Sequence, residues 1–485
     1  MKKLSILVAS IFMLTACVDS LDDYNVDTKK ATAVPEVTLF SNALKGLIDD
    51  VTTPSVNTNN FRLYVQQWST TQYLDEPRYN LTARTIPQSF WQAIYRDVIA
   101  DIKESRRILN LNTLVSAESK ANQLAQLEIT EVYAWSILVN TFGNIPYTQA
   151  MDPTNPLPVY DDAKTVYYSL LDRLDASLVT INSTGTGFGA GDLIYKGDMT
   201  KWKKFGNSLK LKLALVIADS DATKAKALAA AAAPNVFTSN ADKAAFAYVS
   251  TPPNYNPVAQ NLNILFSSRQ DYVISSVFAD KLNTLKDPRR PVYFTPTAPD
   301  TYVGGAYGFL NSYSDFSHPG TKIIDPTLEG LFMDYSEVEF DLAEAVERGF
   351  ITGSAEAHYN AAITASITYW ASQGSLTTGP ADAAAYLAQP AVAYTTATGD
   401  WKQKIGTQKW IALYNRGYEA WVEWRRLDFP KLSPPTGGNA PAGLAIPLRI
   451  IYPINEQTLN PGSWSAAGTA IGGDLPSTKL WWDKL

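Results

Sequence analysis

Helical periodicity constrains this chain more than any other sequence feature. Apolar residues recur every three or four positions in several long windows, which places them on one face of a helix. In residues 88–112 they include Phe90, Ile94, Val98 and Ile102, and the pattern returns in 116–140 after a short polar break, which predicts an antiparallel helical hairpin. Further helices are predicted over residues 161–181, 198–219, 335–350, 354–372 and 401–427. We expect a mostly α fold, with tetratricopeptide-like helix pairs as the scaffold and minor β structure.

Long irregular stretches interrupt the predicted helices. They cover about residues 53–87, 286–326, 375–398 and 432–447. Loops of this length in a compact protein are usually functional or disordered. The aromatic content of residues 289–318 is too high for a flexible linker. We therefore expect ordered loops that cover one face of a single helical domain over residues 37–485, with 375–398, rich in Ala, Gly and Thr, as a surface excursion without chemistry.

The N-terminus is typical of an exported lipoprotein. Two lysines precede an apolar stretch over residues 4–14, and Leu-Thr-Ala-Cys then ends at Cys17. This arrangement predicts a signal peptide over 1–16, a diacylglycerol-modified Cys17 and a tether over 17–36. Three aspartates soon after Cys17 resemble the tag that directs lipoproteins of Bacteroidota to the cell surface. No later stretch is apolar over the length of a membrane span, so the lipid is the only membrane attachment that we expect.

Composition excludes several functions. Lys plus Arg number 41 against 47 Asp plus Glu, so no basic excess is available for a nucleic acid. A single Cys and two His exclude a zinc site built from His and Cys spacing and also a disulfide framework. Motifs for nucleophilic, nucleotide or metal chemistry are missing, so no cofactor is expected. Glu337, Asp341 and Glu344 share one helical face, and a charged face beside an apolar stripe explains them better than a glycosidase pair does.

Aromatic residues in two loops suggest a ligand site. A sugar-binding surface needs rigid aromatic planes beside polar side chains. Residues 68–84 and 302–318 both supply this combination, with Gln72, Arg78 and Asn311 among the polar groups. Core packing remains the alternative for each ring. The predicted ligand-binding residues are Trp68, Tyr73, Tyr79, Tyr302, Tyr307 and Tyr313.

Four motifs, in order along the chain, resemble the SusD/RagB family of outer-membrane lipoproteins, in its shorter SusD-like branch. They are Thr-Phe-Gly-Asn-Ile-Pro-Tyr at 141–147, the helix pair at 341–370, the tryptophan-rich helix at 408–426 and Arg-Ile-Ile-Tyr-Pro at 449–453. Within them, Trp410, Trp421 and Trp424 fall on a helical stripe that favours packing. Arg425 and Arg426, near a helix end, are interpreted as partners of carbonyl or carboxylate groups.

The resemblance implies a surface protein that holds a glycan or a peptide and passes it to a SusC-like TonB-dependent transporter, without catalysis. It implies localisation at the cell outer membrane through the lipid anchor. Two other functions stay open: a surface glycoside hydrolase, which needs a carboxylate pair in a cleft, and a structural lipoprotein without a ligand. Neither the ligand nor the particular transporter follows from the sequence.

Overall fold

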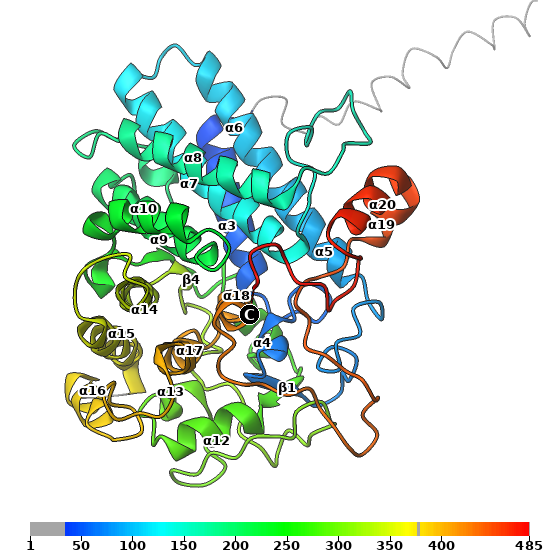
Figure 1. Ribbon diagram of the computed structural model, residues 1–485, viewed down its shortest axis with the longest axis vertical. Coiled ribbons are helices and arrows are strands. Elements are labelled where there is room, and N and C mark those ends of the chain that lie inside the picture. The colour runs from blue at the N-terminus through cyan, green and yellow to red at the C-terminus, as the bar shows by residue number, and fades with distance from the viewer. Residues whose placement is uncertain (1–33, 376–378, 485) are drawn as a thin grey trace, which may run out of the picture.

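The computed structural model describes residues 34–375 and 379–484, so the predicted signal peptide, Cys17 and most of the tether lie outside the described residues. Helices dominate it, as predicted (Figure 1). In the described part of the chain, no helix combines the length and apolar character that a membrane span needs. The helices of the first half are α3 (Glu36–Thr52), α4 (Phe61–Tyr64), α5 (Ile86–Gln92), the π-helical η1 (Ala93–Ile99), α6 (Ala100–Leu111), α7 (Ala117–Phe142), α8 (Ala163–Thr180), α9 (Met199–Val216) and α10 (Ala222–Ala232).

The second half adds further helices. They are α11 (Pro257–Leu262), α12 (Ser276–Thr284), α13 (Arg290–Tyr293), α14 (Tyr335–Glu347), α15 (Ala355–Trp370), the π-helical η5 (Ala371–Ser375), α16 (Gly379–Leu387), α17 (Trp401–Ala412), α18 (Gly417–Leu427), α19 (Ile454–Leu459) and α20 (Pro461–Ala470). Single 3₁₀ turns occur at Gly189–Gly191, Ala233–Asn235 and Asn240–Asp242. In the described part of the chain, five helices outside the predicted set, α3, α10, α12, α16 and α20, have nine or more residues.

Helix pairs form the scaffold, which confirms the tetratricopeptide-like prediction. Consecutive helices α7, α8, α9 and α10 pack against one another, and α14 packs against α15. The predicted hairpin is α5–η1–α6 followed by α7. Helix α7 begins after Ser116, whose side chain accepts a hydrogen bond from Ser119 N, and ends at Gly143 with φ +86°. Such an N-cap and a positive-φ glycine are the usual signals that start and stop a helix.

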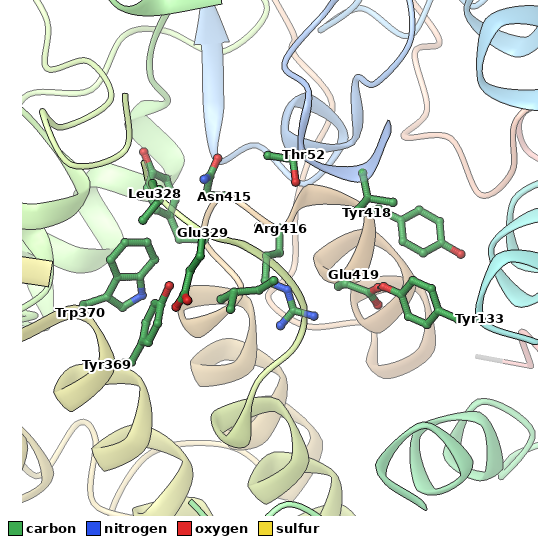
Figure 2. Close-up of a pocket in the computed structure, with 14 residues that line it drawn as sticks. Thr52, Tyr133, Leu328, Glu329, Tyr369, Trp370, Asn415, Arg416, Tyr418 and Glu419 are labelled. Atoms are coloured by element: carbon green, nitrogen blue, oxygen red, sulfur yellow. The ribbon is translucent and has the colours of Figure 1, made fainter. Parts of the chain in front are cut away.

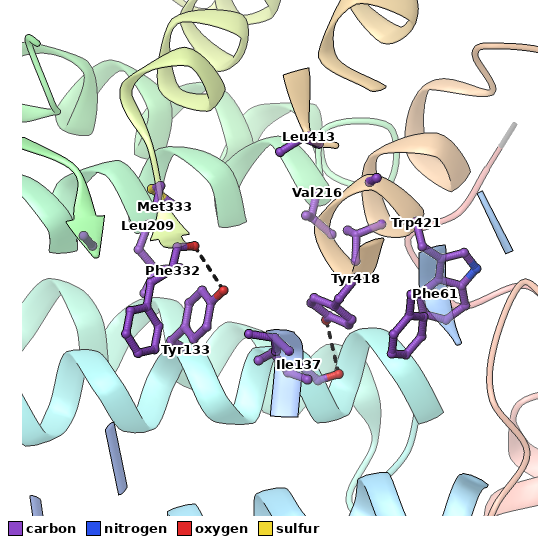
Figure 3. Packing of buried hydrophobic residues seen from close by; sticks show 14 of the residues in the cluster. Phe61, Tyr133, Ile137, Leu209, Val216, Phe332, Met333, Leu413, Tyr418 and Trp421 are labelled. Carbon is purple, nitrogen blue, oxygen red and sulfur yellow. Dashed lines mark hydrogen bonds between the residues drawn. The ribbon is translucent and has the colours of Figure 1, made fainter. Parts of the chain in front are cut away.

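The core joins helices from both halves of the chain. Figure 3 shows Tyr133 and Ile137 of α7 facing Phe332 on one side and Tyr418 on the other. The hydroxyl of Tyr133 donates to Phe332 O at 3.2 Å, and that of Tyr418 donates to Ile137 O at 3.3 Å. These buried tyrosines add apolar area while their polar atoms remain hydrogen-bonded. The core therefore depends on contacts between segments about 200 or more residues apart in the sequence.

The minor β structure consists of two short antiparallel pairs. Strand β1 (Trp68–Thr70) pairs with β3 (Tyr272–Ile274), with Trp68 opposite Ile274 and Thr70 opposite Tyr272. Strand β2 (Ala244–Phe246) pairs with β4 (Gly330–Met333). Both pairings join distant segments, and the first one fixes the start of the 71–85 loop against the 264–271 segment.

The single helix predicted over residues 401–427 is wrong, because the chain breaks between α17 and α18. Asn415 has φ +68°, a left-handed conformation that Asn tolerates better than most residues. Its side-chain oxygen and its carbonyl accept hydrogen bonds from Arg62 at 3.0 and 2.7 Å. A Cβ on Gly417 would lie 2.5 Å from Arg62 N. The break therefore brings α18 against α4, a contact between distant segments that helical periodicity alone does not reveal.

The predicted loops are largely irregular, with short elements inside them. Residues 53–87 contain α4, β1 and the start of α5, and residues 286–326 contain α13. The predicted surface excursion at 375–398 contains α16, whose Tyr386 is buried and lies 3.0 Å from Gln408. This segment therefore packs onto the body. In the described chain, residues 432–447 form neither helix nor strand.

Candidate functional site

The three acidic residues of α14 lie in the interior. Glu337 contacts Lys212 at 2.9 Å and Arg416 at 2.7 Å, and Asp341 contacts Lys409 at 2.5 Å. Burial opposes ionisation of Glu337, but Arg416 and Lys212 outweigh it and lower its pKa to about 2. These acids form the structural charged face that the sequence favoured, and it is covered by the other helices.

The network of buried charges continues to α18, and we call this network the seam. Arg426 donates to Glu344 and to Glu423, the latter at 2.5 Å, and Arg348 donates to Glu344 at 2.6 Å. Oxygens of Asp341, Glu344 and Glu423 lie within 4.8 Å of one another. Burial and the nearby acids raise the pKa of Asp341 to about 7 despite Lys409. These carboxylates are therefore paired with lysine and arginine side chains of the same chain.

Arg425 and the tryptophans also have structural roles, as predicted. The guanidinium of Arg425 donates to the carbonyls of Leu448 and Asn140, both at 2.8 Å. Trp410 and Trp421 are buried. Trp424 is partly buried and donates to Pro430 O at 3.0 Å.

A small polar cavity lies beside this seam (Figure 2). Its volume is about 30 Å³, and its walls include Glu329, Tyr369, Arg416 and Glu419. Arg416 donates to Phe332 O at 2.9 Å, whereas its Nε and Nη1 atoms have no hydrogen-bond partner. A cavity of this size accommodates one or two water molecules and no sugar ring. It is therefore a poor candidate for the ligand site.

Four of the six predicted ligand-binding rings are buried. Trp68 is 1% exposed and donates to the Tyr414 hydroxyl at 3.0 Å. Tyr307 donates to Leu63 O at 2.6 Å, and Tyr79 accepts from Gln66 at 3.3 Å. Tyr302 packs at 6.0 Å from Phe294. These rings hold the loops on the body, so we do not carry Trp68, Tyr79, Tyr302 and Tyr307 forward as ligand contacts.

Tyr73 is only partly buried and has two arginines close to its ring. The guanidinium carbons of Arg84 and Arg269 lie 5.0 and 6.0 Å from its ring centre, and Arg269 also donates to its hydroxyl at 2.9 Å. Both arginines are paired with carboxylates, Arg84 with Glu76 and Arg269 with Asp271. Cation–π contact and these ion pairs hold the ring in one orientation. The result is a rigid, partly exposed aromatic plane edged by polar groups.

Arg78, in the same loop as Tyr73, joins three loops. It donates to Gly308 O at 2.9 Å and to Asn439 Oδ1 at 2.7 Å, and its guanidinium lies 5.7 Å from the ring centre of Phe309. The Asn311 amide lies within 3.1 Å of four acceptors, among them Thr70 O. The segments 71–85, 306–311 and 433–439 are thus fixed to one another. We call this surface, together with 264–271, the loop face.

Tyr313, the sixth predicted residue, is partly buried in the 297–318 loop. Its ring stacks on His318 with 4.3 Å between centres and 12° between planes. Burial lowers the pKa of His318 below 6.5, which favours the neutral imidazole at neutral pH. The stack supplies a second flat surface, which we treat as a candidate separate from Tyr73.

A groove of about 330 Å³ adjoins Tyr73 through Arg84. Its walls come from residues 81–88 and from 451–457, with Leu81, Ile454 and Gln457 among them. This volume falls at the lower end of the roughly 300–1,000 Å³ of small-molecule sites. Tyr73, Arg84 and the groove together form our candidate ligand site.

Comparison with known proteins defines the class. The family described as starch-binding and associating with the outer membrane matches residues 28–453. The chain therefore belongs to the SusD-like family. No curated protein sequence matches it.

Solved structures agree over almost the full length. A chitin-binding protein has a TM-score of 0.78 at 26% identity, with 93% of this chain and 99% of that chain covered. A SusD-like protein from Bacteroidetes has a TM-score of 0.80 at 21% identity, with 93% and 100% covered. A chitin-binding SusD homologue from Flavobacterium johnsoniae has a TM-score of 0.74 at 24% identity, with 92% and 98% covered.

Sequence reasoning missed Arg269, which holds Tyr73, and two residues that line the groove, Ile454 and Gln457. Arg269 is nearly 200 residues from Tyr73, and no local pattern links them. Ile454 and Gln457 belong to a C-terminal helix that we did not predict. The alternation in Tyr272–Ile274 is too short to signal the strand that brings Arg269 to Tyr73.

Proposed function

We propose that this chain is a cell-surface lipoprotein that binds a glycan and delivers it to a SusC-like TonB-dependent transporter. Membership of a starch-binding family that associates with the outer membrane supports the glycan and the location. Two similar structures come from chitin-binding proteins, which makes chitin fragments the first ligand to test. A peptide remains the alternative ligand.

The main structural support for this proposal is the difference in exposure between the acids of α14 and the ring of Tyr73. The acids on α14 are ion-paired in the interior, whereas Tyr73 keeps part of its ring exposed beside a groove. Stacking on a sugar face and hydrogen bonding from its edges are the interactions that such a surface offers. The site is therefore suited to binding, and the function needs no reaction step.

Anchoring is proposed through Cys17. A Cys17→Ala precursor should lose incorporation of a fatty-acid analogue and should leave the outer-membrane fraction. Equal labelling of the variant and the parent chain would contradict lipidation at this residue.

The ligand is tested with a glycan and peptide array probed with the chain lacking residues 1–17. Binding to chitin oligosaccharides or to another glycan, abolished or weakened by Tyr73→Ala, supports the proposal. Binding to peptides alone would replace the glycan by a peptide. Binding to neither would leave a structural lipoprotein as the better account.

The transporter is tested by purification of the lipidated chain from its native outer membrane in mild detergent. A TonB-dependent barrel that co-purifies in a fixed ratio supports delivery. Purification of the chain alone, under conditions that preserve other outer-membrane complexes, would contradict it.

A further inference from the structure

The turn between α6 and α7 exposes two leucines at one end of the molecule. Leu111 is 69% exposed and Leu114 is 95% exposed, and Val115 beside them is partly buried. Residues 110–117 contain no charged side chain. Single exposed leucines are common, but two in one uncharged turn form a small apolar tip. We call residues 110–117 the leucine tip.

The described chain begins beside this tip. Asn112 donates to Glu36 Oε1 at 3.0 Å, and Ser105 donates to Glu36 O at 2.7 Å, so the start of α3 is fixed to the end of α6. Figure 1 shows the α6–α7 turn at one end of the longest axis, with β1 and α12 toward the opposite end. The segment that leads to Cys17 therefore joins the body at the end that carries the leucine tip.

The length of that segment limits how far the tip lies from the lipid anchor. Val34 follows Cys17 by 17 positions, so a fully extended chain spans at most about 60 Å. An acylated Cys17 thus keeps the tip within reach of the bilayer at high effective concentration.

We propose that Leu111 and Leu114 insert into the outer leaflet of the outer membrane beside the acylated Cys17. This inference rests on the lipid anchor of the proposed function. Insertion removes the apolar tip from water. Because the lipid anchor already holds the tip near the bilayer, two leucines are enough for insertion. With the tip inserted, β1 and the loop that follows it lie toward the opposite end of the longest axis from the inserted leucines (Figure 1).

A single-thiol probe tests the proposal. The acylated sulfur of Cys17 is blocked and the chain has one Cys, so Thr113→Cys supplies the only free thiol for an environment-sensitive dye. The lipidated chain is reconstituted into vesicles of phosphatidylethanolamine and phosphatidylglycerol that contain a nitroxide-labelled phosphatidylcholine. Leu265→Cys, at a 77% exposed leucine close to Arg269, is the matched control.

We expect at least twofold stronger quenching by the nitroxide lipid at position 113 than at position 265, and weaker quenching by aqueous iodide. Leu111→Ser with Leu114→Ser should abolish the difference, while circular dichroism and glycan binding stay unchanged. Equal quenching at 113 and 265 in chains that float with the vesicles overturns the inference alone. Failure of the chains to float overturns the anchor and the inference together.

Discussion

The seam of charges between α14 and α18 and the loop face around Tyr73 use the same residue types differently. In the seam, Arg426 and Lys409 are buried and ion-paired with Glu344, Glu423 and Asp341. At the loop face, Arg84 and Arg269 are also ion-paired, but they flank a ring that keeps part of its surface exposed. Burial therefore separates charges that hold the fold together from charges that prepare a surface for a ligand.

The largest expected effect is on the seam. Arg426→Ala removes one cation from each of two buried carboxylates and leaves Glu344 with Arg348 alone and Glu423 with Lys409 alone. The loss should reduce the free energy of unfolding by about 3–5 kcal/mol. Urea unfolding measures this change. The control Arg107→Ala, at an exposed arginine paired with Glu104, should unfold like the parent chain. Equal stability of Arg426→Ala and the parent would contradict a structural role for the seam.

Trp68 should behave like a residue of the interior although it was predicted from a ligand-site pattern. Trp68→Ala leaves a cavity and removes the donor to the Tyr414 hydroxyl, which keeps its own bond to Tyr293 O, at a cost of about 3–5 kcal/mol in stability. Calorimetric titration of the folded fraction should give the parent affinity for the glycan. If Trp68→Ala lost affinity for the glycan while its unfolding stayed unchanged, Trp68 would be a ligand contact instead.

Tyr73 should show the opposite result. Tyr73→Ala should weaken glycan binding by about 1–3 kcal/mol, because the ring is a fixed aromatic anchor. Its melting temperature should stay close to that of the parent. The control Tyr73→Phe keeps the ring and should keep most of the affinity. A sharp fall in melting temperature with unchanged affinity would make Tyr73 a packing residue.

The smallest expected effect is a pH dependence in the loop that carries Tyr313. Burial lowers the pKa of His318 below 6.5 in the folded chain, so the unfolded chain takes up a proton first as the pH falls. The contribution of His318 to stability is therefore fully present above pH 6.5 and is lost as the pH falls below it. Between about pH 7.5 and 5.5, the parent should lose more stability than His318→Gln. Parallel unfolding curves for both chains would contradict this.

The sequence predicts the helices well and the loops only in part. Periodicity locates the hairpin of 88–140 and the pair of 335–372, because each helix buries a continuous apolar stripe. It fails at Asn415, where a contact with Arg62 decides the break. It also fails to separate Trp68 from Tyr73, since both are aromatic residues beside polar neighbours.

The loop site depends on contacts that cross the chain. Tyr73 acquires its fixed position from Arg84 nearby and from Arg269 in a distant segment. Whether a ring is exposed likewise depends on which distant segments cover it. The local sequence pattern does not contain this information. The resemblance to SusD-like proteins predicted the class, whereas the particular rings had to come from the fold.

Hydrogen–deuterium exchange with and without the glycan selected on the array tests the central claim most directly. The account predicts slower exchange in residues 71–88, 264–271 and 451–457 when the glycan is bound, with α14 and α18 unchanged. Tyr73→Ala should remove that protection at the same glycan concentration. Protection only in α14 and α18, or protection in other segments that leaves out the loop face, would contradict the account. It would mean that the loops do not bind the ligand or that the buried charges are more than structural.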